Sequence, residues 1–120
     1  MSKKILIAED DPDYQELHQT IFSTSYEVTI VDSTETAFEK LAKEHFDLAI
    51  VDINLLGMTG LEILRKIKCA GLTQEIPVVL CSGLSGSFIK EQALELGAAG
   101  FVTKPFNVEA ILGLVRAILK

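Results

Sequence analysis

The chain has 120 residues, of which 48% are hydrophobic and 23% charged, which is typical of a single soluble globular domain. Its net charge of −6 argues against direct binding to nucleic acid or to an anionic membrane surface. Its two cysteines, Cys69 and Cys81, are too few for a disulfide framework or a metal set, and no apolar run approaches the roughly 20 residues of a membrane span. We therefore expect one cytoplasmic domain over residues 1–120, without membrane insertion.

Short apolar runs alternate with amphipathic segments along the chain. The runs predict buried strands at residues 5–8, 27–31, 48–51, 78–81 and 99–102. A helix is expected after each strand, and the last has the clearest apolar stripe, formed by Val108, Ile111, Leu112, Val115, Ile118 and Leu119. This alternation predicts a doubly wound α/β fold, (βα)5, with a five-stranded parallel sheet and helices on both faces.

Several residues mark helix ends. Pro12 suits a first helical turn, and Gly97 a helix stop. The cap candidates of the second helix are Asp32, Ser33 and Thr34. The stripe of the first helix is Tyr14, Leu17, His18 and Ile21. Because His18 and His45 lie away from the acidic strand ends, we expect both histidines on the surface.

Polar residues follow the predicted strands at the points where those strands end. They are Glu9 and Asp10 after the first strand, Asp52 after the third, Ser82 after the fourth and Lys104 after the fifth. Taken alone, Asp52 is as compatible with a helix cap as with a functional group. Right-handed crossovers, however, bring the carboxyl ends of parallel strands to one edge, where sites form in such folds.

Three converging carboxylates require a cation, because two of them about 4 Å apart repel by roughly 4 kcal/mol at an effective dielectric of 20. Carboxylate oxygens without histidine or cysteine favour Mg²⁺. Lys104 adds a positive charge and Ser82 a hydroxyl donor. Together these groups suit phosphoryl transfer to Asp52 as nucleophile, with the metal and the lysine neutralising charge on the phosphoryl oxygens.

Four segments carry a resemblance to a known family: ILIAEDDP, LAIVDINLLGMTG, VVLCSG and GFVTKPF, in this order and spacing. The chain resembles, over essentially its whole length, a single-domain response regulator receiver domain of the CheY-like superfamily, from two-component signalling. The resemblance implies the flavodoxin-like strand order 2-1-3-4-5.

The resemblance also assigns roles at matching positions. Asp52 corresponds to the phosphoacceptor, Ser82 to the switch hydroxyl, Phe101 to the switch aromatic and Lys104 to the phosphate-contacting lysine. The implied metal ligands, for Mg²⁺ or a substituting Mn²⁺, are Glu9, Asp10, Asp52 and the backbone carbonyl of Asn54. Lys104-Pro105 matches a peptide bond that is usually cis. Two positions depart from the pattern: Leu56 stands where proline is common, and Leu84 where many relatives are polar.

The implied function is that of a phosphoacceptor rather than an enzyme. A sensor histidine kinase or histidine phosphotransfer protein donates to Asp52, and the face of the fourth helix, fifth strand and fifth helix is switched for a downstream protein effector or for relay. We expect a monomer or a weak phosphorylation-dependent dimer. No residues follow the last helix to form an output domain, so the signal is expected to leave through protein contact, unless the chain was cut from a longer protein.

Three alternatives remain to be weighed. A receiver-like adaptor that acts without phosphorylation would normally lose part of the acidic site. A haloacid dehalogenase-type phosphatase usually needs a second aspartate where this chain has Asn54. A flavodoxin-like FMN binder would have a first loop rich in hydrogen-bond donors, whereas Glu9, Asp10 and Asp11 repel phosphate.

Overall fold

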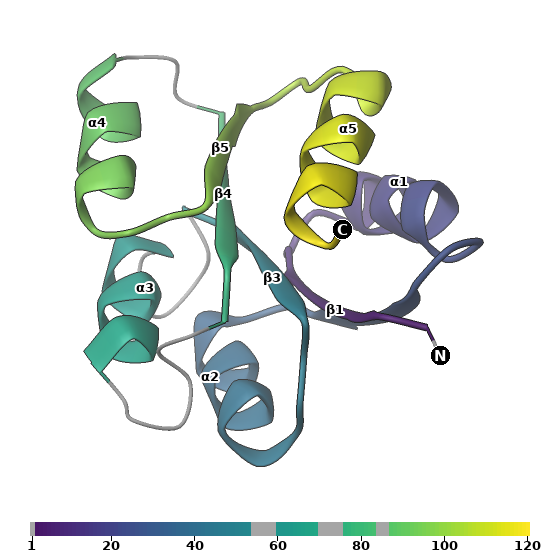
Figure 1. Ribbon diagram of the computed structural model, residues 1–120, viewed down its shortest axis with the longest axis horizontal. Helices are drawn as coiled ribbons and strands as arrows, with labels where there is room; N and C mark the ends of the chain where they lie inside the picture. Colours follow the sequence, from purple (N-terminus) through teal and green to yellow (C-terminus); the bar gives the residue numbers. More distant parts are fainter. Residues whose placement is uncertain (1, 54–59, 70–75, 84–86) are drawn as a thin grey trace.

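The protein, described by a computed structural model, is a five-stranded parallel sheet between two layers of helices (Figure 1). The structure describes residues 2–53, 60–69, 76–83 and 87–120. The strand order is β2-β1-β3-β4-β5, and every neighbouring pair is parallel. This order and the doubly wound architecture confirm the fold predicted from the sequence.

The elements alternate strictly along the chain. The strands are β1 (Lys4–Ala8), β2 (Glu27–Val31), β3 (Leu48–Asp52), β4 (Val78–Ser82) and β5 (Gly100–Thr103). The helices are α1 (Pro12–Phe22), α2 (Thr34–Lys43), α3 (Gly60–Cys69), α4 (Ser87–Glu95) and α5 (Val108–Ile118). The predicted fifth strand was placed one residue too early; Gly100 begins it, and a Cβ there would lie 2.7 Å from Leu114 Cδ2 of α5.

Two apolar clusters fill the space on either side of the sheet. Alternate strand residues such as Leu6 and Val51 pack under α2, α3 and α4, whereas Ile7 and Ile50 pack under α1 and α5. The same division of the helices is visible in Figure 1. All five residues of β3 and of β4 are buried, because helices cover both faces of these central strands.

Side chains fix the helix starts. Ser33 caps α2 by accepting a hydrogen bond from the Thr36 amide, so geometry selects it from the three candidates. Asp11 caps α1 and accepts from the Asp13 amide at 2.8 Å. These caps satisfy amide groups that have no partner within the helix. Gly97, which follows α4, has φ of +96°, the left-handed conformation expected of a glycine at a helix stop.

One expectation about the surface was wrong. His18 is not a surface histidine. It is 1% exposed, and its ring points from α1 toward Phe106. The ring stacks on Phe22, with centroids 6.0 Å apart, and packs against Phe106 at 5.4 Å. Val108, the first residue of α5, belongs to the predicted stripe and is 40% exposed. His45 is exposed, as predicted.

Candidate functional site at the carboxyl ends of the strands

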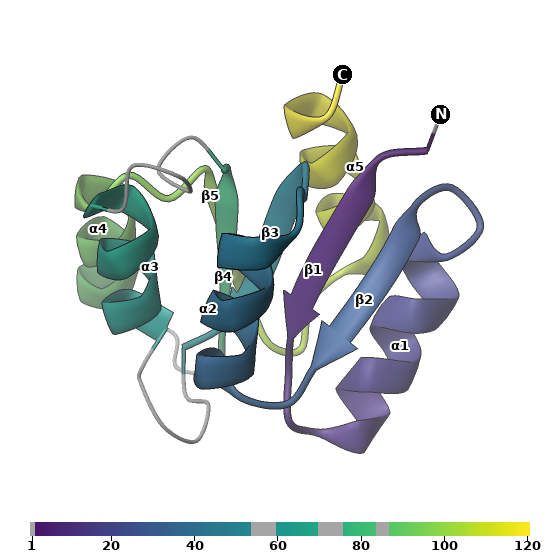
Figure 2. The same cartoon turned by 90° about the horizontal axis from the view of Figure 1, so that it is seen from below.

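The predicted site residues gather at one edge of the sheet. Asp52 is the last residue of β3 and Ser82 the last of β4, while Glu9 directly follows β1 and Lys104 directly follows β5. Because the strands are parallel, their carboxyl ends share this edge; Figure 2 shows the arrowheads of β1 and β2 at the same end of the sheet. Strand topology therefore brings together residues that are up to 95 positions apart in the sequence, since 104 − 9 = 95.

Lys104 lies between the two buried carboxylates. Its Nζ is 2.6 Å from Glu9 Oε1 and donates a short hydrogen bond to Asp52 Oδ2. The Lys104 side chain is only 12% exposed, and Glu9 and Asp52 are 1% and 7% exposed. One ammonium thus neutralises charge on two acidic side chains in a partly desolvated place, where an unpaired carboxylate would be costly.

Burial and ion pairing shift the pKa values of Glu9 and Lys104. Burial raises the pKa of Glu9, and the hydrogen bond from Lys104 only partly opposes that rise. Burial alone would lower the pKa of Lys104, but its hydrogen bonds to Asp52 and Glu9 raise it above the usual lysine value. Lys104 therefore remains a cation at neutral pH.

Main-chain hydrogen bonds hold the ends of the strands in register. The Lys104 amide donates to the Ser82 carbonyl at 2.7 Å, and the Glu9 amide donates to the Val31 carbonyl at 2.9 Å. Asp11 donates its amide to Glu9 Oε2 at 3.1 Å, which orients the Glu9 carboxylate. Ser82, the last residue of β4, is fully buried.

The acidic residues have the spacing of a metal site. Glu9, Asp10 and Asp52 each offer a carboxylate oxygen, and these oxygens lie within 4.8 Å of one another. Within the described residues, this is the one group of three or more side chains with such spacing. The donor set is entirely hard oxygen, and Asp10 is exposed to solvent, so the site fits a cation such as Mg²⁺ that keeps several of its waters.

Other sequence predictions have mixed outcomes. Phe101 is half-buried on β5 and packs against the cluster under α2, α3 and α4. The Lys104-Pro105 peptide bond is cis, as predicted. Asn54, Leu56 and Leu84 lie outside the described residues, so the metal-binding carbonyl of Asn54 stays a prediction.

Two residues of α1 were missed by the sequence reasoning. The Gln15 side-chain amide donates to the Glu9 carbonyl at 2.6 Å, and the Tyr14 ring centroid lies 4.2 Å from Lys104 Nζ. Tyr14 had been assigned only to the apolar stripe of the helix. Its contact with the site could have been inferred from its position in the first turn of α1, which begins three residues after Glu9.

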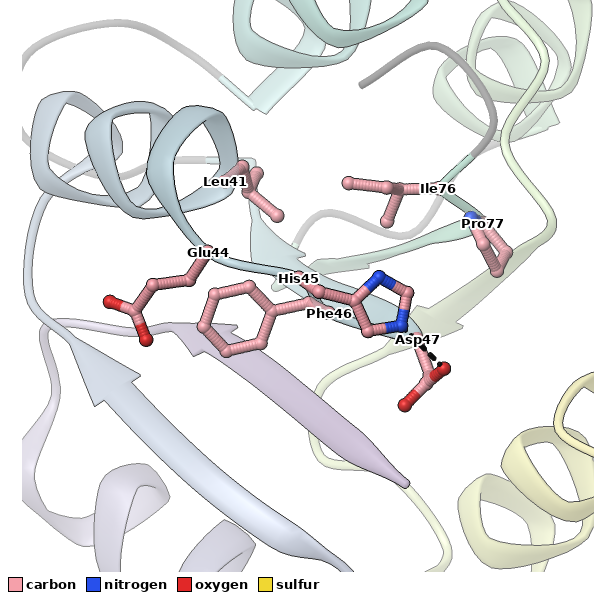
Figure 3. A pocket seen from close by; sticks show the side chains of 7 residues that line it. All are labelled: Leu41, Glu44, His45, Phe46, Asp47, Ile76 and Pro77. Carbon is pink, nitrogen blue, oxygen red and sulfur yellow. Dashed lines mark hydrogen bonds and ion pairs between the residues drawn. The ribbon is translucent and has the colours of Figure 1, made fainter. Parts of the chain in front are cut away.

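A surface pocket of about 380 Å³ lies at the opposite edge of the sheet (Figure 3). Its lining residues are Leu41, Glu44, His45, Phe46, Asp47, Ile76 and Pro77. Several of them directly precede β3 or β4, so the pocket lies at the amino ends of those strands. His45 Nε2 is 3.0 Å from Asp47 Oδ1 on its wall, but neither residue belongs to the group with metal-ligand spacing.

Comparison with known proteins identifies the class to which this fold and site belong. The family model described as the response regulator receiver domain matches residues 5–116. The chain belongs to this family. The expectation raised by its four sequence segments is therefore confirmed at the level of the family.

Individual relatives agree. The chain is 36% identical over 116 residues to response regulator protein FleR of Pseudomonas aeruginosa and 32% identical over 121 residues to response regulator PleD of Caulobacter vibrioides. The alignments cover 96% and 100% of this chain but only 24% and 27% of those proteins, so the chain spans about a quarter of their length.

Solved structures show the same fold. The chemotaxis response regulator CheY4 of Vibrio cholerae superposes with a TM-score of 0.90 at 25% identity, covering 99% of this chain and 100% of that one. A CheY-like receiver domain protein of Methanospirillum hungatei also gives 0.90, at 28% identity, covering 99% and 94%. In the part of the chain that the structure describes, no helix has the length and apolar character needed to cross a bilayer.

Proposed function

We propose that this receiver domain accepts a phosphoryl group on Asp52 from the phosphohistidine of a sensor histidine kinase or histidine phosphotransfer protein. The observation that carries the proposal is the ion-paired cluster of Glu9, Asp52 and Lys104, with Asp10 beside it at metal-ligand spacing. The domain acts as a phosphoacceptor and not as an enzyme with a separate substrate. It works in the cytoplasm, where such kinases present their phosphohistidines.

In the transfer, a carboxylate oxygen of Asp52 attacks the phosphorus of the phosphohistidine. The P–N bond breaks, its electron pair returns to the imidazole nitrogen, and an acyl phosphate forms on Asp52. Glu9, Asp10 and Asp52 would hold Mg²⁺ or Mn²⁺, which would supply positive charge to offset that of the phosphoryl oxygens. The Lys104 ammonium moves from the Asp52 carboxylate to a phosphoryl oxygen, and the Ser82 hydroxyl donates a further hydrogen bond.

The phosphorylated domain then presents an altered face to a protein effector. We assign this face to α4, β5 and α5, with Phe101 and Ser82 coupling it to Asp52. Leu94 of α4 and Val108 of α5 are large hydrophobic residues that are 48% and 40% exposed. These two residues belong to α4 and α5, two of the three elements of this face. The domain itself is a monomer or forms a weak phosphorylation-dependent dimer.

The test is intact-mass measurement after incubation with acetyl phosphate and Mg²⁺. The wild-type protein should gain the mass of one phosphoryl group, which alkali removes because an acyl phosphate is labile. A chelator should suppress the gain, and Asp52→Ala should abolish it. Asp32→Ala is the matched control, because Asp32 is an exposed carboxylate that follows β2 at the same edge and lies outside the cluster.

Two outcomes would count against the proposal. An alkali-resistant phosphate, or one retained in Asp52→Ala, would place the modification on another group. A folded wild-type protein that takes up no phosphate would instead favour a receiver-like adaptor that binds its partners without phosphorylation.

A further inference from the structure

The ammonium of Lys104 has a third neighbour besides its two carboxylates. Tyr14, in the first turn of α1, places its ring centroid 4.2 Å from Lys104 Nζ. An ammonium at this distance from an aromatic face is attracted by the negative charge of the ring face. Because the Lys104 side chain is 12% exposed, water competes only weakly with this contact.

Tyr14 is itself held in place by aromatic packing. Its ring lies 5.6 Å from that of Phe106, and Phe106 lies 5.4 Å from His18, which is buried on α1. Phe106 follows Lys104 by two residues on the segment between β5 and α5. The segment that carries Lys104 therefore also supports the ring that the Lys104 ammonium contacts.

The ring differs from the carboxylates in what else it can bind. Glu9 and Asp52 are the candidate ligands of a divalent cation, so a cation on them weakens their attraction for Lys104. An aromatic face is a poor ligand for a hard cation, which selects oxygen. The contact with Tyr14 is consequently the one of the three that a bound divalent cation does not compete for directly.

We propose that Tyr14 is a positioning residue, whose ring holds the Lys104 ammonium beside Asp52 when a divalent cation occupies the carboxylates. This role rests on the proposed phosphoacceptor function. Without the ring, the flexible four-carbon stem of Lys104 would carry the ammonium toward solvent once its carboxylate partners are neutralised. Fewer molecules would then have the ammonium in place when the phosphodonor arrives.

The first test uses proton–carbon NMR of the lysine ε-methylene groups and needs no phosphorylation. A ring this close shifts the Lys104 ε-methylene signal upfield, and that shift should persist when Mg²⁺ is added. It should remain in Tyr14→Phe, disappear in Tyr14→Leu and be unchanged in Tyr26→Leu. Tyr26 is the matched control, because it is also half-buried and packs on Phe22 at 6.2 Å, at the far end of α1. Loss of the upfield shift in the wild type on adding Mg²⁺ would overturn the proposal.

The second test measures the rate of phosphate uptake from acetyl phosphate in Mg²⁺. Tyr14→Leu should be slower than the wild type by about three- to tenfold, the range of one partly desolvated cation–π contact. Tyr14→Phe and Tyr26→Leu should stay near the wild-type rate. Equal rates in Tyr14→Leu and the wild type would overturn the role of Tyr14 alone, whereas a wild type that takes up no phosphate would overturn the phosphoacceptor function as well. If Tyr14→Leu does not fold, the Lys104 ε-methylene shift of the wild type on adding Mg²⁺ still tests the role of Tyr14.

Discussion

Lowering the pH from 7 to 5 should destabilise the fold through His18. The imidazole is 1% exposed, lies between Phe22 and Phe106, and its Nδ1 has no hydrogen-bond partner among the described residues. Burial lowers the pKa of His18 from 6.5 to about 4, and the positive charge of Lys104 adds to this effect. A positive charge on this ring would be desolvated, because the ring is buried and its Nδ1 has no hydrogen-bond partner among the described residues.

The sign and size of the effect follow from the two pKa values. Below pH 6.5 the unfolded chain takes up a proton on His18 that the folded chain, with a pKa of about 4, does not. Stability therefore falls as the pH falls through this window, at up to about 1.4 kcal/mol per pH unit. Between pH 7 and pH 5 the loss is about 2 kcal/mol, and it approaches about 3 kcal/mol below pH 4.

Urea unfolding of the wild type and of His18→Leu at the two pH values measures this contribution. The free energy of unfolding should drop about 2 kcal/mol further in the wild type than in His18→Leu. His45→Gln, which removes an exposed histidine, should behave like the wild type. Burial raises the pKa of Glu9, which acts in the opposite direction but equally in each protein. The same pH dependence in His18→Leu and the wild type would refute the reasoning.

Four further predictions concern the site edge, β5 and the helices. Lys104→Met removes the ammonium from two buried carboxylates. Urea unfolding with a chelator should show a loss of about 3 kcal/mol in the free energy of unfolding, and a smaller loss with Mg²⁺, which replaces the missing positive charge. An equal loss in both buffers would contradict this. Gly113→Ala should raise the free energy of unfolding by about 0.5–1 kcal/mol, because a Cβ at this position inside α5 meets nothing within 4 Å. Gly100→Ala should instead lower the melting temperature, because its Cβ would crowd Leu114. Ser33→Ala should cost about 1 kcal/mol through loss of the α2 cap, measurable by thermal unfolding.

The fold could be predicted because its central strands are covered on both faces. Residues 48–51 of β3 and 78–81 of β4 are continuous apolar runs, and every residue of the two strands is buried. Short apolar runs that alternate with amphipathic segments are typical of strands in a parallel sheet covered by helices. The ends of elements were less determined. Asp32, Ser33 and Thr34 were equally good caps by residue type, and only the backbone geometry at Ser33 decides among them.

The proximity of the site residues was also predictable, because it depends on topology rather than on side-chain detail. Glu9, Asp52, Ser82 and Lys104 all stand at strand ends, and parallel strands bring those ends together. Which of these charged side chains pair with one another depends on side-chain length and burial. The Lys104 ammonium pairs with Glu9 and Asp52, while Asp10, adjacent in sequence to Glu9, faces solvent; successive residues at the end of a strand point in different directions.

The errors on α1 have one physical origin. Tyr14 and His18 are four residues apart, so they lie on the same face of the helix, and that face turns toward α5 and Phe106. The spacing already placed His18 on the apolar stripe, but its distance from the acidic strand ends was taken to mean a surface position. The aromatic rings along this face of α1 account for both features. They exclude water from His18, whose pKa falls to about 4, and they hold the Tyr14 ring against the Lys104 ammonium.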